Sequence, residues 1–341
     1  MTLQETCVGV IGGSGFIGTW LVEALRREAY EVRIIDIEPA ERFPKLMVKA
    51  DVRNRAELLE ACRGCDLLYN LAAEHRDDVR PRERYHQVNV QGAENTCAVA
   101  QELGIDKIIF TSTAAVYGIP EGEVDERAPL NPFNDYGRTK LAAEEVFRKW
   151  ADSSPQRSLA IIRATVVFGP GNRGNVYVLL QQIASGRSVI VGNGSNRKSM
   201  AYVGNVAHFL MHALRFGPGV HVHNYVDKPD IDVRDLVSLV NQTLGTSGTF
   251  RIPYAAGVAA GMACDLAARL TGRQFPISAV RVRKYAANTQ FAADRALRTG
   301  FKPPHALRDA LVETIRHEFA PMVSPSPQSP QTSAPEVGAP R

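Results

Sequence analysis

A short apolar run leads directly into a glycine-rich turn in Cys7-Val8-Gly9-Val10-Ile11-Gly12-Gly13-Ser14-Gly15-Phe16-Ile17-Gly18. From Phe16 to about Glu28 the apolar residues recur at helical spacing. A strand, a glycine turn and a helix in this order predict a dinucleotide-binding site. Gly12 permits the tight turn, Gly15 lets the backbone approach a pyrophosphate, and Gly18 lets the helix pack closely on the strand. The first helical amides, those of Phe16 and Ile17 included, would face the phosphates.

The next two strand patterns each end in an acidic residue. A second strand is predicted at residues 31–35 and ends in Asp36, and a third at residues 46–50 is followed by Asp51 and Val52. A carboxylate after the second strand accepts hydrogen bonds from both ribose hydroxyls and repels a 2′-phosphate, which favours NAD over NADP. We expect Asp51 and Val52 to reach the adenine edge of the cofactor.

Strand and helix patterns keep alternating as far as residue 168. Helices are expected at 55–62 and within 81–104, and strands at 66–71, 107–110 and 159–163. This rhythm predicts an α/β fold, a Rossmann-type doubly wound parallel sheet. At the end of the fourth strand, Leu71, Ala72 and Ala73 are expected beside the cofactor, because the two small alanines allow a close approach.

The second half of the chain loses the strict alternation. Polar turns at 169–175 and 192–198 flank a predicted helix at 176–185 and a strand at 188–191, and further helices are expected at 205–216, 233–244 and 307–319. We expect residues 1–168 to form mainly the NAD-binding domain, catalytic residues included. Residues 169–320 would form mainly a smaller α+β substrate-binding lobe that partly returns to the first domain. Residues 321–341 are rich in Pro and Ser and are expected to be disordered.

The composition is that of a globular protein. Of the 341 residues, 45% are hydrophobic and 22% charged, and the net charge of +4 comes from scattered basic residues, so no nucleic-acid partner is expected. Cys62 and Cys65 form a lone C-x-x-C, and the histidines lack ligand spacing, so reduced thiols and no metal are predicted. The chain shows neither a signal peptide nor a run of ~18 apolar residues, which favours the cytoplasm.

One segment, residues 254–270, consists almost entirely of Ala, Gly, Val, Leu and Met, interrupted by Asp265 and Arg269. Such a segment is an ordinary core helix in one interpretation. In the other it is an amphipathic helix that rests on a membrane surface or on a lipid-linked substrate. The second interpretation predicts peripheral contact with the inner face of the cytoplasmic membrane.

The sequence Tyr136-Gly137-Arg138-Thr139-Lys140 places a phenol and an ammonium one turn apart on a helix. A free tyrosine has a pKa of about 10 and is a poor base at neutral pH. A neighbouring cation and a positive nicotinamide ring both favour the phenolate. This pair suits a residue that takes a proton from a sugar hydroxyl while hydride leaves the same carbon. The alternative is a surface helix in which the spacing has no chemical role.

Four ordered motifs together resemble the extended short-chain dehydrogenase/reductase family and, within it, the NAD-dependent sugar 4-epimerases. They are the glycine turn, Asn70-Leu71-Ala72-Ala73, Thr113 and Tyr136-x-x-x-Lys140, and the resemblance extends from about residue 7 to residue 319. It implies an isomerase that holds NAD tightly, oxidises the sugar C4 hydroxyl and returns hydride to the opposite face of a 4-keto intermediate. It also implies a homodimer.

The resemblance assigns roles to individual residues. Tyr136 would be the general base and later the acid, and Lys140 would lower its pKa and bind the nicotinamide ribose. Thr113 would hydrogen-bond the reacting C4 oxygen, and Asn89 would support the backbone around the cofactor. Ala114 and Ala115 stand where sugar 4,6-dehydratases of the family carry an Asp-Glu pair, so the sequence lacks the groups for water elimination.

The expected substrate contacts depart from the family pattern in places. Lys198 occupies a position where many members have Arg, which keeps the charge and loses the bidentate fork. Arg197 stands beside it, and the family strand Arg, here Arg163, is followed by Ala164 instead of Pro. The second phosphate-contacting position aligns with Lys284, with Arg281 and Arg283 as alternatives. His75, Arg76 and Asn175 are expected to contact the sugar or its diphosphate.

Several longer strings resemble a narrower group, the bacterial 4-epimerases that interconvert N-acetylglucosamine and N-acetylgalactosamine on undecaprenyl diphosphate. These strings lie at 73–79, 133–140, 172–177, 198–205 and 224–230. The resemblance implies a role in O-antigen, lipopolysaccharide or related surface-polysaccharide synthesis. Two alternatives remain open, namely the same chemistry on UDP-GlcNAc or UDP-glucose, and an NAD-dependent sugar dehydrogenase or reductase.

Overall fold

The computed structural model describes residues 6–76, 79–119, 122–186, 188–271 and 278–320. Its centre is a seven-stranded sheet in which every pairing is parallel, in the order β11-β7-β5-β4-β1-β2-β3. From one edge to the other the strands are β11 (Gly219–Tyr225), β7 (Ser158–Ala164), β5 (Lys107–Thr113), β4 (Leu67–Asn70), β1 (Cys7–Ile11), β2 (Glu31–Asp36) and β3 (Met47–Lys49).

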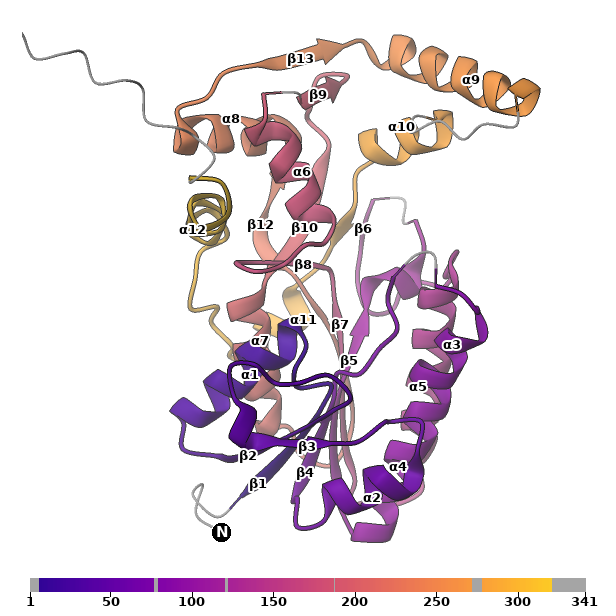
Figure 1. The fold of residues 1–341 in the computed structure, drawn as a ribbon, viewed down its shortest axis with the longest axis vertical. Coiled ribbons are helices and arrows are strands. Elements are labelled where there is room, and N and C mark those ends of the chain that lie inside the picture. Colours follow the sequence, from indigo (N-terminus) through magenta and orange to yellow (C-terminus); the bar gives the residue numbers. More distant parts are fainter. Residues whose placement is uncertain (1–5, 77–78, 120–121, 187, 272–277, 321–341) are drawn as a thin grey trace, which may run out of the picture.

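Helices cover both faces of this sheet (Figure 1), which explains why its central strands are apolar on both sides. One face packs against α2 (Arg55–Cys62), α4 (Gly92–Leu103) and α5 (Asp135–Asp152). The other packs against α1 (Phe16–Arg27) and α7 (Val203–His212), which continues as a 3₁₀ turn to Arg215. The predicted Rossmann-type doubly wound sheet is therefore confirmed.

The register of the sheet brings the proposed site residues to one edge. Ile11 pairs with Asn70, Asn70 with Phe110, and Thr113 with Ala164, so the carboxyl ends of β1, β4, β5 and β7 lie in a row. The strand order reverses between β1 and β4, and ligands of such sheets bind in the crevice at that switch point. The glycine turn after β1 lies at this point.

The long helix expected within 81–104 is interrupted. It consists of α3 (Glu83–His86), a π-helical turn at Gln87–Gln91, and α4. Asn89 lies within the π-helical turn and is buried. Such turns widen a helix locally and are frequent at functional sites.

Most of the rest of the chain builds a second lobe above the sheet (Figure 1), whereas α11 (Asp294–Leu297) packs on the same face of the sheet as α1 and α7. Its core lies between α6 (Asn175–Ala184), α8 (Val233–Leu244) and α12 (Leu307–Phe319). One three-stranded sheet contains β12 (Asp227–Asp232), β10 (Arg197–Tyr202) and β8 (Val166–Phe168). The remaining elements are β6 (Glu123–Val124), β9 (Ser188–Val191), β13 (Thr249–Ile252), α9 (Tyr254–Thr271), α10 (Ala279–Ala286) and β14 (Gln290–Phe291).

Several of these strands were not predicted. β10 begins with Arg and Lys, and half of the residues of β12 are Asp, so neither strand shows an apolar pattern. The chain also returns to the central sheet through α7 and β11, which pairs with β7. The expected disordered tail at 321–341 lies outside the described residues.

The helix α9 lies at the outer end of the second lobe (Figure 1). Gly257 and Gly261 are buried, and a Cβ at Gly261 would lie 2.6 Å from the backbone nitrogen of Ala279 in α10. The opposite face is exposed, with Met262, Leu266 and Leu270 accessible at 57%, 59% and 78%. The prediction of an ordinary core helix is therefore wrong. Within the described ranges, no helix combines the length and apolar character needed to cross a membrane.

Candidate active site

Two glycines of the turn are required by the protein's own packing. Gly12 has φ +79°, and a Cβ there would lie 2.5 Å from the backbone nitrogen of Ala72 at the end of β4. A Cβ at Gly18 would lie 2.6 Å from Cα of Gly13. Side chains at these positions would separate the turn from β4 or from α1. Gly12 and Gly18 therefore each have a steric reason in the protein's own packing, but Gly18 faces the turn and not, as expected, the strand.

Gly15 is different, because its surroundings are open. The residue is exposed, and the nearest described atom to a Cβ there is the carbonyl oxygen of Gly12, at 3.3 Å. Gly15 precedes α1 and has no side chain with which to cap it, so the first amides of the helix stay available. An uncapped helix start beside an open glycine fits a pyrophosphate. Phe16 and Ile17 turn their side chains towards the core of the second lobe.

Asp36 is already oriented beside this turn. Its Oδ2 accepts a hydrogen bond from the Ser14 amide at 3.0 Å, and its Oδ1 accepts one from the Glu38 amide at 3.1 Å. These bonds hold the carboxylate at the end of β2, where a ribose would lie. Asp51 has a different environment, since Arg53 forms a salt bridge with it at 2.5 Å and lowers its pKa. Val52 is buried and packs against Gly92.

Asn89 connects the segment after β4 to α5, the helix that contains Tyr136 and Lys140. Its side-chain oxygen accepts from the Glu74 amide at 2.8 Å, and its Nδ2 donates to the Glu74 carbonyl at 3.0 Å and to the Thr139 hydroxyl at 2.9 Å. Thr139 directly precedes Lys140. The π-helical turn thus fixes the half-buried segment from Leu71 to Glu74 against α5.

Thr113 and Tyr136 come together at the carboxyl edge of the sheet. Thr113 ends β5, and its hydroxyl accepts from the Ala115 amide at 3.1 Å. Burial of the Tyr136 hydroxyl raises the pKa of the phenol to about 12, and a hydrogen bond with Thr113 offsets part of that rise. The lowering expected from Lys140 is not among the causes of this shift and stays a prediction.

Lys140 lies one helical turn beyond Tyr136 and is only 1% exposed. Its ammonium lies 4.0 Å from the centre of the Phe110 ring. Burial lowers the pKa of Lys140 to about 7, and the negative charge of Glu144 acts in the opposite direction. A lysine with this pKa can change its charge near neutral pH, which suits a group that acts on a neighbouring phenol.

Beneath these residues lies a buried ionic contact that we did not predict. Glu144, one turn beyond Lys140, forms two hydrogen bonds with Arg163 of β7 at 2.9 and 2.7 Å. The spacing of Lys140 and Glu144 was visible in the sequence, but the same spacing is common on solvated helix faces. Only the fold shows that this Glu is buried.

The expected substrate contacts are spread over the second lobe. Lys198 donates to the carbonyl of Ala287 at 2.7 Å, just beyond α10, and burial lowers its pKa to about 8. The backbone nitrogen of Arg197 donates to Asn288, which ties the same segment to β10. Lys284 and Arg281 belong to α10, but their side chains lie outside the described part of the chain, whereas Arg283 is exposed.

The remaining expected contacts are exposed. His75 and Arg76 lie in the loop after β4, and Asn175 is the first residue of α6. The carbonyl of Arg76 accepts a hydrogen bond from the Tyr85 hydroxyl, which holds this loop against α3. The structure therefore groups Thr113, Tyr136 and Lys140 closely, and leaves the three polar residues available to a ligand.

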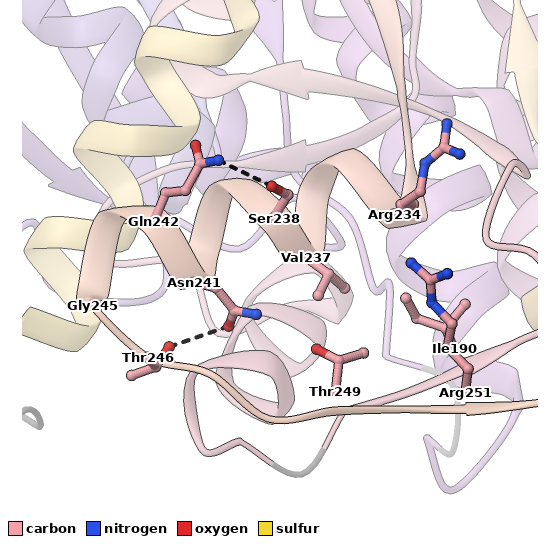
Figure 2. A pocket seen from close by; sticks show the side chains of 10 residues that line it. All are labelled: Ile190, Arg234, Val237, Ser238, Asn241, Gln242, Gly245, Thr246, Thr249 and Arg251. Atoms are coloured by element: carbon pink, nitrogen blue, oxygen red, sulfur yellow. Dashed lines mark hydrogen bonds between the residues drawn. The ribbon is translucent and has the colours of Figure 1, made fainter.

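An open pocket of about 570 Å³ lies elsewhere, between α8 and β13. Figure 2 shows Arg234 and Arg251 at one end of this pocket and Gln242 and Thr246 at the other. Gln242 donates to Ser238 at 3.2 Å. None of the residues that line it is a predicted site residue, so the pocket does not belong to the candidate active site.

Comparisons with known proteins agree with this geometry. The sequence pattern of the NAD dependent epimerase/dehydratase family matches residues 8–226. The chain is 44% identical to the N-acetyl-alpha-D-glucosaminyl-diphospho-ditrans,octacis-undecaprenol 4-epimerase of Escherichia coli O157:H7, over 91% of this chain and 94% of that protein.

Two solved structures share the fold at lower identity. One is the UDP-glucuronic acid 4-epimerase from Bacillus cereus in complex with NAD, with a TM-score of 0.71 and 21% identity over 92% of this chain and 98% of that one. The other is the UDP-N-acetylglucosamine 4-epimerase from Methanobrevibacter ruminantium M1, with a TM-score of 0.72, 21% identity and the same coverage. With its glycine turn, its Tyr136/Lys140 pair and a family match over most of its length, the chain belongs to the NAD-dependent epimerase/dehydratase family.

Proposed function

We propose that this enzyme is an NAD-dependent 4-epimerase that interconverts N-acetylglucosamine and N-acetylgalactosamine on undecaprenyl diphosphate, for surface-polysaccharide synthesis. The observation that carries the reaction type is the grouping of Thr113, Tyr136 and Lys140 at the sheet edge that also bears the glycine turn. The lipid-linked substrate is supported by the 44% identity with the Escherichia coli enzyme over nearly its full length.

In the proposed mechanism Tyr136 takes the proton of the sugar C4 hydroxyl, and Thr113 donates a hydrogen bond to the same oxygen. NAD held at the glycine turn would supply the reversible hydride transfer at C4. The 4-keto sugar rotates in the site, so that the hydride returns to the opposite face of C4. Tyr136 then returns the proton to the C4 oxygen. No net oxidation results. Because burial raises the pKa of Tyr136 to about 12, a positive charge close by is needed to favour the phenolate.

The site lacks groups for the competing dehydration. Ala114 is buried, and the Ala115 amide is bonded to Thr113, so this turn presents methyl groups where water loss would need an acid and a base. The residue types at positions 114 and 115 distinguish epimerisation from dehydration, because a turn of the same shape could carry two carboxylates.

The cofactor and diphosphate contacts form the next part of the proposal. NAD would contact the amides at Gly15 to Gly18, Asp36, Asp51 and Val52, and the strand end at Leu71 to Ala73. The sugar diphosphate would lie between the two parts of the chain, 1–168 and 169–320. Its charge would be met by Lys198 and by the basic helix α10, with Lys284, Arg281 or Arg283 as the second contact. The remaining expected contacts are His75, Arg76 and Asn175.

The exposed face of α9 supports a peripheral membrane contact at the cytoplasmic side. Phe250 and Tyr254 lie close in sequence to Met262, Leu266 and Leu270, and all five are exposed. The one acidic residue of α9, Asp265, accepts a hydrogen bond from the Ala279 amide and so serves the contact with α10. A Leu266→Asp variant should lose sedimentation with anionic phospholipid vesicles and keep its turnover on a soluble substrate. If the variant still sediments with the vesicles, the membrane contact is contradicted.

The expected homodimer is tested separately, by the mass of the purified protein in sedimentation-velocity ultracentrifugation.

One assay decides the substrate. The purified enzyme is incubated with GlcNAc-diphospho-undecaprenol and with UDP-GlcNAc in parallel, without added cofactor, and the sugars are separated after release. We expect GalNAc from the lipid substrate at least ~10-fold faster, a preference of about 1.4 kcal/mol. If only UDP-GlcNAc is converted, the enzyme is a UDP-sugar 4-epimerase instead. The lipid-linked substrate would then no longer be a reason to expect membrane contact. Stoichiometric NADH would indicate a dehydrogenase instead.

A further inference from the structure

A buried ionic network lies directly beneath the candidate catalytic residues. Glu144 is 0% exposed and Arg163 is 2% exposed. The guanidinium binds the carboxylate in a fork, Nε to Oε1 at 2.9 Å and Nη2 to Oε2 at 2.7 Å. Ser112 donates to Oε1 at 2.6 Å, and the half-buried Arg148 reaches Oε2 at 3.3 Å. The carboxylate is thus fully hydrogen-bonded.

The network continues past Arg163. Its Nη1 donates to the Tyr117 hydroxyl at 2.8 Å, and that hydroxyl donates to the side-chain oxygen of Asn224 at 2.7 Å. The guanidinium also lies over the Tyr117 ring, 5.0 Å from its centre. Through these contacts α5 is bonded to β5, to the turn after it, to β7 and to β11. All four segments meet below the carboxyl edge of the sheet.

The members of this network adjoin the catalytic groups in sequence. Tyr136, Lys140 and Glu144 follow one another at four-residue spacing on α5 and so share one side of that helix. Ser112 precedes Thr113, and Tyr117 ends the turn that Thr113 begins. One carboxylate therefore ties the helix with the Tyr/Lys pair to the strand with Thr113.

Stability alone does not explain such a pair. Taking two charges out of water costs as much as their attraction returns, and well-packed apolar residues often serve equally well. Lys140 offers a second reason, because its ammonium is buried and lies over an aromatic ring. The charged groups that face Glu144 are Arg163, Arg148 and, one turn away, Lys140. Glu144 is the charge that raises the pKa of Lys140, and Arg163 is not among the causes of that shift.

We propose that Glu144, held in place by Arg163, is a positioning residue that keeps Lys140 charged and keeps Tyr136 aligned with Thr113. The inference rests on the proposed epimerase function. It is supported by the pKa of Lys140, which burial lowers to about 7 and which Glu144 raises against that effect. Without the carboxylate, Lys140 would lose its proton at lower pH and would no longer favour the Tyr136 phenolate.

The test is the pH profile of epimerisation by Glu144→Gln. We expect the alkaline limb, where Lys140 loses its proton, to move to lower pH by about one unit. A one-unit drop of a pKa near 7 lowers the charged fraction of Lys140 at pH 7 by about fivefold, so kcat falls by about that factor. KM changes little because the substituted residue does not touch the sugar. The matched control is Glu145→Gln, a neighbour that is 60% exposed and lies 3.7 Å from Arg148. Its profile should equal that of the wild type.

A second variant separates positioning from folding. Glu144→Gln leaves the charge of Arg163 buried and unpaired, which can unfold the protein. The double variant Glu144→Gln/Arg163→Met removes both charges, and thermal unfolding reports whether stability returns. The proposal predicts recovered stability with the alkaline limb still displaced. A folded double variant with the wild-type limb would overturn it. Failure of the wild type to epimerise any sugar would refute the proposed function instead, so the two outcomes are distinct.

Discussion

Replacing Gly12 by Ala tests the contact on which the cofactor turn depends. The new Cβ would lie 2.5 Å from the nitrogen and 2.8 Å from Cα of Ala72, which are backbone atoms and cannot rotate away. The positive φ of +79° costs an L-residue about 1–2 kcal/mol. Overpacking adds about 1–3 kcal/mol. We therefore expect Gly12→Ala to lower the free energy of unfolding by about 2–5 kcal/mol and to release NAD.

The chain offers a matched control at Gly64. Its φ is +78°, and no described atom lies within 4 Å of a Cβ placed there. Gly64→Ala should therefore cost only the backbone term of about 1–2 kcal/mol and keep its NAD. Urea unfolding gives the free energies, and the absorbance of cofactor released by denaturation gives the NAD content. Equal destabilisation of the two variants, or full NAD content in Gly12→Ala, would refute the steric reasoning.

Three further variants probe the site. Gly15→Ala should keep its free energy of unfolding within about 1 kcal/mol of the wild type, because the Gly12 oxygen is the one described atom near the new Cβ. The variant should nevertheless lose NAD on gel filtration. Retained NAD would count against a pyrophosphate contact at Gly15. Asp36→Ala should narrow the ratio of NADP to NAD dissociation constants in titration calorimetry, and an unchanged ratio would contradict its role. Lys140→Met should abolish turnover and raise the unfolding temperature at pH 6, since it removes a buried charge. That gain should shrink as pH rises from about 7 towards 10.5, the ordinary lysine pKa, because above it the wild-type Lys140 is neutral in the folded and in the unfolded protein. A variant that unfolds at a lower temperature than the wild type at pH 6 would contradict this reasoning.

The first half of the fold was predictable because its determinants are local. A buried strand, glycines at fixed positions and an apolar helix face follow one another within residues 7–28, and each has a steric reason that needs no distant partner. The strand β11 was not predicted. It carries His221, His223 and Asn224, and it is a strand because it pairs with β7, some 60 residues earlier in the chain.

The candidate site shows the same division. Tyr136 and Lys140 could be identified by their spacing, and Thr113 by the family resemblance of its position before them. Glu144 stands four residues after Lys140, but this spacing alone does not show burial. The packing of α5 on the sheet buries Glu144 and leaves its neighbour Glu145 exposed. Lys198 was expected to meet a phosphate, and its ammonium is in contact with the carbonyl of Ala287. Such hydrogen-bond partners are decided by packing between residues that are far apart in the sequence, and a local sequence pattern does not contain this information.

The most direct test of the central claim follows the hydrogen on C4 of the sugar. GlcNAc-diphospho-undecaprenol with deuterium at C4 is incubated with the purified enzyme in ordinary water, and the released GalNAc is analysed by mass spectrometry. Transient oxidation at C4, with Tyr136 moving only the hydroxyl proton, predicts that GalNAc retains the deuterium. It also predicts that Tyr136→Phe, with NAD still bound, forms no GalNAc. Loss of the label to water, or epimerisation by the Phe variant, would contradict the mechanism.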